Sequence, residues 1–201
     1  RAEFQDLLYQ TIERPGAQSS DQGTVVPTGV QVGGRVKTGS VYRITQQGNM
    51  TATGGKFDLA ISGRGYFQVM MPSGEIAYTR AGNFSPNDQG QLVTEDGYLI
   101  EPAITIPSDA TDISISKSGQ VQAIRAGQTA QDVIGTLELA TFVNEAGLDA
   151  IGDNLLKESA ASGAPTVGIP GVDGIGVINQ GYTEASNVDA VSEITALIVA
   201  Q

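Results

Sequence analysis

Residues 57–78 read FDLAISGRGYFQVMMPSGEIAY, and this stretch decides the fold. Its apolar side chains fall at every second position in three successive runs: Phe57, Leu59 and Ile61; Phe67, Val69 and Met71; Ile76 and Tyr78. Alternation of this kind is typical of antiparallel strands that bury one face. Glycines follow the first run and Pro72-Ser73-Gly74 follows the second, and such residues favour tight turns. The stretch therefore predicts short antiparallel strands joined by turns.

The same period of two recurs along the rest of the chain. The further alternating runs are Val30, Val32 and Val36; Ile104 and Ile106; Ile113 and Ile115; Leu137 and Leu139. Two more turn sequences, Asn87-Asp88-Gln89-Gly90 and Asp96-Gly97, separate runs of this kind. The fold class we expect is mainly β: a compact antiparallel β domain with an extended N-terminal arm and short helical segments at the two ends.

The predicted organisation has three parts. Residues 1–50 hold the end of a helix, an extended arm within the stretch of about 9–36 and a β-hairpin segment. Residues 51–178 form the β domain, and residues 179–201 form a return segment and the start of a C-terminal helix. With 201 residues and 40% apolar side chains, the chain can build a packed core. Its 26 glycines and its low charged content of 16% favour a turn-rich β protein.

Charge and missing residue types exclude several functions. There are 22 acidic residues against 11 basic ones, and the net charge of -11 argues against nucleic acid, which requires a basic face. No apolar run approaches the roughly 18 residues of a membrane span, so we expect no membrane insertion. His and Cys are absent, and with them most zinc sites, thiol nucleophiles and histidine-based triads.

The short motifs that could bind a cofactor or a metal are incomplete. Gly34–Ser40 lacks the lysine that a phosphate loop places after its second glycine. Gly63-Arg64-Gly65 lacks the third glycine of a dinucleotide fingerprint, and Asn87–Gly90 lacks the closing glutamate of a calcium loop. The carboxylate pairs Glu95/Asp96 and Asp149/Asp153 have no sugar-binding aromatic residue placed near them. We therefore predict no enzyme, no catalytic residue, no cofactor and no metal site.

Both ends of the chain carry short helical patterns. Phe4, Leu7 and Leu8 share one helical face, although ten residues are too few for a stable isolated helix. At the other end, the apolar residues at three- and four-residue steps are Val188, Val191, Ile194 and Ile198. This stripe, here called the helix seam, is typical of a coiled coil or of a helix that packs on its own β domain.

A segment from Tyr9 to Thr28 follows the first helical pattern, and from Pro15 onward it is polar and without apolar periodicity. It contains Pro15-Gly16 and a run of Gln, Ser and Asp, and Pro27 cannot donate to a central strand. The segment is expected to be an extended arm. The same composition is also typical of a flexible linker.

Four stretches of sequence together resemble one known family. They are 1–9 (RAEFQDLLY), 59–69 (LAISGRGYFQV), 78–98 (from YTRAGNF through GQLV to DGY) and 180–188 (QGYTEASNV). In this order they span nearly the whole chain, which resembles the flagellar rod and hook family of bacteria. The added stretch Tyr9–Ser20, with 25–32 after it, is most similar to the distal rod subfamily, because hook proteins generally lack it.

The resemblance implies a structural subunit of the flagellar basal-body rod. Its copies would assemble helically into a straight, rigid drive shaft that transmits torque from motor to hook. The implied partners are the chain itself, proximal rod and hook proteins, and the peptidoglycan and outer-membrane ring proteins as a bushing. The implied location is the basal body, spanning the periplasm, after export through the flagellar secretion channel without a cleaved signal peptide. The chain lacks the family's terminal helices, so we expect a fragment that stays monomeric and does not polymerise.

The residues that the resemblance implicates are packing residues. The subunit-packing arm comprises Tyr9, Gln10, Thr11, Ile12, Arg14, Pro15, Gly16, Ala17, Gln18, Ser19 and Ser20. The helix seam would lead into the inner tube of the polymer. Two alternatives remain open: a hook or proximal rod subunit, or, from another class, an extracellular β domain that binds glycan or another ligand. Exposed aromatic platforms would favour the binding module.

Overall fold

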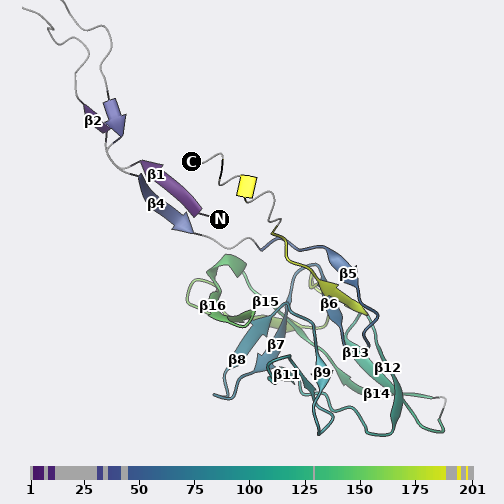
Figure 1. The fold of residues 1–201 in the computed structure, drawn as a ribbon. Helices are drawn as coiled ribbons and strands as arrows, with labels where there is room; N and C mark the ends of the chain where they lie inside the picture. Colours follow the sequence, from purple (N-terminus) through teal and green to yellow (C-terminus); the bar gives the residue numbers. More distant parts are fainter. Residues whose placement is uncertain are drawn as a thin grey trace, which may run out of the picture. The chain divides into compact units, whose positions relative to one another are not determined.

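The structure, a computed structural model, describes residues 2–6, 9–11, 31–33, 36–41, 45–128, 130–188, 194, 195 and 198. The chain divides into two units, residues 1–44 and residues 45–201. Figure 1 draws both units.

The first unit is an antiparallel ladder. β1 (Ala2–Asp6) pairs with β4 (Val36–Val41), and β2 (Tyr9–Thr11) pairs with β3 (Gln31–Gly33) (Figure 1). The two pairings continue one another, from Ala2 opposite Val41 to Thr11 opposite Gln31.

The structure has a strand where the sequence predicts the end of a helix. β1 gives Ala2–Asp6 extended backbone, whereas Leu7 and Leu8 of the expected helical segment lie outside the described residues. A helix of this length does not recover the free energy that its nucleation costs. The β-branched residues of β4 supply a strand partner for the same stretch.

The second unit is built from short antiparallel strands, which confirms the mainly β fold class. Its strands are β5 (Met50–Ala52), β6 (Leu59–Ser62), β7 (Tyr66–Met70), β8 (Ile76–Thr79), β9 (Ser85–Pro86), β10 (Leu92–Val93), β11 (Leu99–Glu101), β12 (Ala110–Ile115), β13 (Gln120–Arg125), β14 (Gln131–Thr136), β15 (Leu139–Thr141), β16 (Asp149–Gly152), β17 (Leu155–Lys157), β18 (Thr166–Gly168), β19 (Val177–Gln180) and β20 (Tyr182–Glu184). A short 3₁₀ helix, Glu145–Gly147, joins β15 to β16.

The largest sheet has the order β16-β17-β8-β7-β11-β10-β9, with β15 also pairing with β7 and β18 pairing with β15. A second sheet has the order β12-β13-β14. Two further pairs, β6 with β19 and β5 with β20, bring the end of the chain back to its beginning in this unit (Figure 1).

The main core lies beneath β6, β7 and the three-stranded sheet. Its fully or nearly fully buried side chains are Leu59, Ile61, Phe67, Phe84, Leu92, Ile100, Ile104, Ile113, Ile115, Val121, Ala123, Leu137, Leu139, Ile175 and Ile178. Phe67 and Phe84 meet edge to face, with ring centroids 5.1 Å apart. A smaller cluster on the other side of β7 contains Tyr66, Tyr78, Ala140, Phe142 and Leu148.

The predicted turns are confirmed. The Gly74 amide donates to the Met71 carbonyl (2.9 Å), and the Gly97 amide donates to the Thr94 carbonyl (2.9 Å). In the Asn87–Gly90 turn, the Asn87 side-chain oxygen accepts from the amide of Gln91 at 2.8 Å. This side chain closes the turn by bonding to the backbone that follows it.

Candidate functional site

The segment that enters the second unit and the segment that returns at its end lie side by side (Figure 1). β5 pairs with β20 antiparallel, and the Ala185 amide extends the pairing by donating to the Asn49 carbonyl at 2.8 Å. We call this two-stranded ribbon, residues 45–53 and 181–187, the stalk. Both described connections of the β domain, the entering and the returning segment, pass through the stalk.

The two halves of the stalk approach each other backbone to backbone. A Cβ added at Gly48 would lie 1.8 Å from the Ala185 carbonyl oxygen, so only glycine fits at this crossing. Next to it, the Asn187 side-chain amide donates to the Gln46 carbonyl at 2.6 Å. These contacts join the entering and returning segments beyond the β5–β20 ladder.

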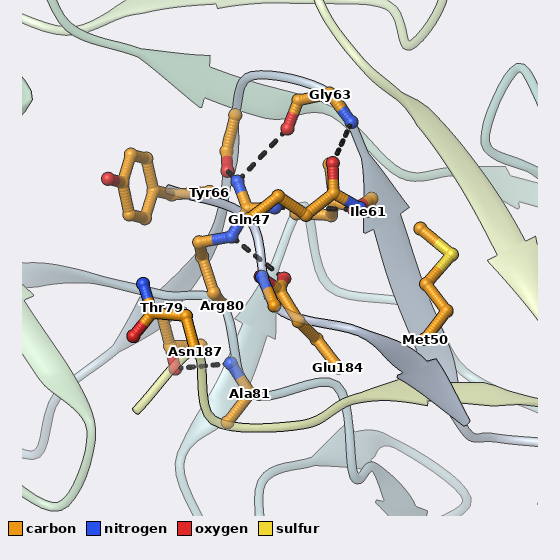
Figure 2. A network of polar contacts seen from close by, with 12 residues as sticks. Gln47, Met50, Ile61, Gly63, Tyr66, Thr79, Arg80, Ala81, Glu184 and Asn187 are labelled. Atoms are coloured by element: carbon orange, nitrogen blue, oxygen red, sulfur yellow. Dashed lines mark hydrogen bonds and ion pairs between the residues drawn. The ribbon is translucent and has the colours of Figure 1, made fainter. Parts of the chain in front are cut away.

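Arg80, which directly follows β8, connects the stalk to the β domain (Figure 2). Its Nε donates to Glu184 Oε2 at 2.9 Å. Its Nη1 donates to the carbonyls of Gly63 (3.1 Å) and Gly65 (2.9 Å), and its Nη2 donates to the carbonyl of Ile61 (3.2 Å). Four of the five N–H bonds of the guanidinium are therefore used.

The acceptors around Arg80 are themselves cross-linked. The second carboxylate oxygen of Glu184, Oε1, accepts from the Gly48 amide at 2.8 Å, so this one side chain bonds to both Arg80 and the entering segment. Gln47 donates through Nε2 to the Ile61 carbonyl (3.1 Å) and accepts through Oε1 from the Gly63 amide (3.0 Å) (Figure 2).

The loop between β6 and β7 owes its shape to two glycines. Gly63 has φ +105° and Gly65 has φ +139°, both in the region that side-chain-bearing residues rarely adopt. A Cβ at Gly63 would lie 3.0 Å from the Gly176 backbone, and one at Gly65 would lie 3.2 Å from Leu139. The loop can therefore press against the domain while both glycine carbonyls accept from one guanidinium.

The Arg80–Glu184 ion pair is largely withdrawn from solvent. The side chains are 21% and 12% exposed, and the Arg80 guanidinium carbon lies 5.8 Å from the centroid of the Tyr66 ring. Partial burial weakens screening by salt and raises the cost of removing one partner. This pair is therefore expected to matter more than the exposed ion pairs of the surface.

The described residues offer little catalytic chemistry. Within them, no group of three or more acidic side chains is placed to hold a metal, and no helix is long and apolar enough to cross a membrane. The carboxylate pairs Glu95/Asp96 and Asp149/Asp153 are exposed. Burial, with a smaller effect of the Glu158 charge, raises the pKa of Tyr78, whereas the Lys56 ammonium bonded to Asp112 lowers the pKa of that exposed carboxyl.

Tyr182 is the one exposed aromatic residue in the described part of the domain, at 42%, so the aromatic residues form no exposed platform there. Tyr66, Phe67, Tyr78, Phe84 and Phe142 are all at most 5% exposed. They belong to the core, so the glycan-binding alternative gains no support from them.

The residues that the sequence singled out lie partly outside the described residues. In the arm, Tyr9, Gln10 and Thr11 form β2, whereas Ile12, Arg14, Pro15, Gly16, Ala17, Gln18, Ser19 and Ser20 lie outside the described residues. In the helix seam, Val188, Ile194 and Ile198 are 57%, 58% and 67% exposed, and Val191 lies outside the described residues. Ile194 and Ile198 have helical backbone.

The residues that join the stalk to the domain were not predicted from the sequence. Arg80 stands in the quoted stretch 78–98 and Glu184 in the stretch 180–188, but they are 104 positions apart. The local signal is that Arg80 follows a strand of mostly buried residues, a place where an arginine needs partners.

Comparison with known proteins places these features in one family. Residues 60–123 match the D1 domain of the flagellar hook protein FlgE/F/G, and residues 179–201 match the C-terminal region of the flagellar basal-body rod FlgEFG proteins. The first match contains Arg80 and its loop, and the second contains β20 and Glu184.

Relatives match over the full chain. It is 68% identical to the flagellar basal-body rod protein FlgG of Caulobacter vibrioides and 50% identical to that of Agrobacterium fabrum, covering all of the chain and 77% of each relative. The flagellar basal-body rod protein FlgF of Caulobacter vibrioides is 36% identical, over 98% of the chain and 74% of that protein.

Proposed function

The chain belongs to the flagellar hook and basal-body rod family, and we propose that it builds the distal rod by assembling helically with copies of itself. It is a structural subunit of the flagellar basal-body rod. The observation that carries this role is the 68% identity to a FlgG protein along the whole chain. The much lower identity to FlgF favours a distal rod subunit over a proximal rod or hook subunit.

The mechanical role that we propose is a straight, rigid shaft that transmits torque to the hook. In a helical assembly of identical subunits, each heterologous contact repeats at every step, so a small interface that limits sliding acts along the whole length. The arm, residues 9–20, is proposed to lie between neighbouring subunits and to limit that sliding. The helix seam is proposed to lead into the inner tube, and the exposure of Ile194 and Ile198 supports packing against another chain.

We propose further that the subunit contacts proximal rod and hook proteins at the two ends of its polymer. The peptidoglycan and outer-membrane rings would surround it in the periplasm, and the flagellar secretion channel would export it without a cleaved signal peptide. A net charge of -11 opposes binding to other acidic surfaces within about one Debye length, ~8 Å at physiological salt. We propose no catalytic activity and no cofactor for this role.

A chimaera tests the role directly. Residues 1–201 replace the matching stretch of the Caulobacter vibrioides FlgG protein in a strain that lacks that protein. We expect swimming to return and isolated basal bodies to carry straight rods in electron micrographs. A stable, exported chimaera that restores neither would contradict the rod function.

The arm is tested in the same chimaera. Deleting residues 15–23 is expected to leave the β domain folded and to give bent or softer rods, because sliding between subunits is no longer limited. A matched control replaces the same nine positions with Gly and Ser. Rods as straight as the parent in both variants would show that the segment is only a linker.

A further inference from the structure

The stalk has almost no apolar attachment to the β domain. None of its residues, 45–53 and 181–187, is buried, although the strands beside it are. Burial of apolar surface, which stabilises the rest of the domain, therefore contributes little to the position of the stalk. The position of the stalk on the β domain therefore depends mainly on its hydrogen bonds and its ion pair.

From this we propose that Arg80 is the positioning residue that holds the stalk on the β domain, as a clamp that can open while the domain stays folded. The evidence for the clamp is the geometry around Arg80, whereas its consequence for the rod rests on the proposed function. With the clamp closed, the entering and returning segments leave the domain in one fixed direction. With it open, the stalk keeps the two Gln47 bonds to Ile61 and Gly63 and, at its other end, the bond from the Gly181 amide to the Asp58 carbonyl at 2.8 Å.

The base of the clamp is rigid. Arg80 follows β8, whose Ala77, Tyr78 and Thr79 are at most 3% exposed. The Thr79 hydroxyl donates to the Asn154 carbonyl (3.0 Å) and accepts from the Ala81 amide (3.0 Å), which fixes the backbone on both sides of Arg80. The guanidinium therefore projects from a fixed point.

The acceptor set requires an arginine. One planar guanidinium reaches Glu184 on the stalk and three backbone carbonyls of the domain at the same time. A lysine has three donors on one nitrogen and cannot cover acceptors spread around a planar fork. Replacing Arg80 by Lys keeps the charge but removes the guanidinium donors from the Gly63 and Gly65 carbonyls, whereas the Ile61 carbonyl keeps its bond from Gln47 Nε2.

Glu184 transmits the clamp to both halves of the stalk. Its Oε2 accepts from Arg80 and its Oε1 accepts from the Gly48 amide. Loss of the Arg80 contact therefore loosens the returning segment and, through Gly48, the entering segment as well. A reversed pair, with Glu at 80 and Arg at 184, cannot restore the clamp, because a carboxylate at 80 faces three carbonyls.

The test is residue-resolved amide hydrogen exchange by NMR on the purified 201-residue chain. In Arg80→Lys we expect the Gly48, Gly63 and Ala185 amides to exchange at least about tenfold faster, while amides of β7 and β11 change less than about threefold. Glu184→Gln should show the same pattern with a smaller change, since the amide oxygen still accepts. Lys157→Gln is the matched control, because it breaks the exposed Lys157–Glu75 pair (2.8 Å) at the opposite end of β8 from Arg80 and should change neither set.

Two results would overturn the clamp. Unchanged exchange at Gly48, Gly63 and Ala185 in both Arg80→Lys and Glu184→Gln would show that other contacts hold the stalk. An equal increase of amide exchange in β7 and in the stalk would show that Arg80 supports only the overall stability of the domain. If Arg80→Lys does not fold, the same comparison is made with Glu184→Gln. Swimming of the unsubstituted chimaera decides the rod function separately, so the two proposals fail on different measurements.

Discussion

Gly82→Ala is the substitution for which the structure gives the clearest cost. Gly82 is buried, and a Cβ there would lie 1.6 Å from the carbonyl oxygen of Leu59 and 2.7 Å from its carbonyl carbon, whereas real Cβ atoms essentially never come within 3.0 Å. The obstacle is backbone at the start of β6, so no side chain can rotate away. The Leu59 amide also donates to the Gly82 carbonyl at 2.9 Å, and Leu59 is fully buried.

The magnitude follows from these two effects. Overpacking of a close-packed interior costs about 1–3 kcal/mol, and losing a buried hydrogen bond costs about 1–3 kcal/mol. We therefore expect Gly82→Ala to lower the free energy of unfolding by about 2–6 kcal/mol, which lowers the thermal midpoint by roughly 4–24 °C for a chain of this size.

Gly97→Ala is the matched control. Gly97 has φ +87° but nothing within 4 Å of an added Cβ, so the substitution costs only the backbone strain, about 1–2 kcal/mol before the smaller gain from a stiffer unfolded chain. Urea unfolding of the 201-residue chain, followed by far-UV circular dichroism, measures both. If Gly82→Ala costs no more than Gly97→Ala, the steric reasoning is refuted.

Three further outcomes are expected. The raised pKa of Tyr78 means that the folded state favours the neutral phenol, so stability is full below the ordinary value of 10.0 and falls as pH rises through the raised value; Tyr78→Phe should flatten the loss seen in urea titrations at alkaline pH. Ser162→Ala removes a buried hydroxyl that accepts from the Ser159 amide at 2.9 Å, and should cost about 1–3 kcal/mol in the same unfolding assay; a cost near zero would mean that water replaces it. Leu139→Ala should cost about 3–5 kcal/mol, because Leu139 is fully buried against the Gly65 loop, and an effect below 1 kcal/mol would contradict the core assignment.

The alternation in residues 57–78 predicted the strands and turns of the domain because it is a local signal. It could not predict that β7 is buried on both faces. Phe67 and Val69 face the side that the pattern assigned to the core, but Tyr66 and Gln68 are at most 5% exposed as well. The second face is covered in part by Phe142, which meets Tyr66 edge to face with centroids 6.0 Å apart. That cover comes from residues more than 70 positions away, and no local period encodes it.

The stalk was hidden from sequence reasoning for the same reason, since its partners come from opposite ends of the domain. The ion pairs of the described residues differ in their exposure to solvent, which the sequence does not reveal. In Lys56–Asp112, Arg64–Glu145, Arg125–Asp132 and Lys157–Glu75, at least one side chain is more than 40% exposed, whereas neither side chain of Arg80–Glu184 exceeds 21%.

Surface pairs weaken as salt screens them, whereas a partly buried pair that also bonds to backbone carbonyls depends on geometry more than on ionic strength. In a chain with twice as many acidic as basic residues, the arginine at 80 thus stands where its charge is screened least. Arg80 lies where the domain contacts both of its connecting segments. We therefore expect the attachment of the stalk to persist at salt concentrations that weaken the exposed ion pairs.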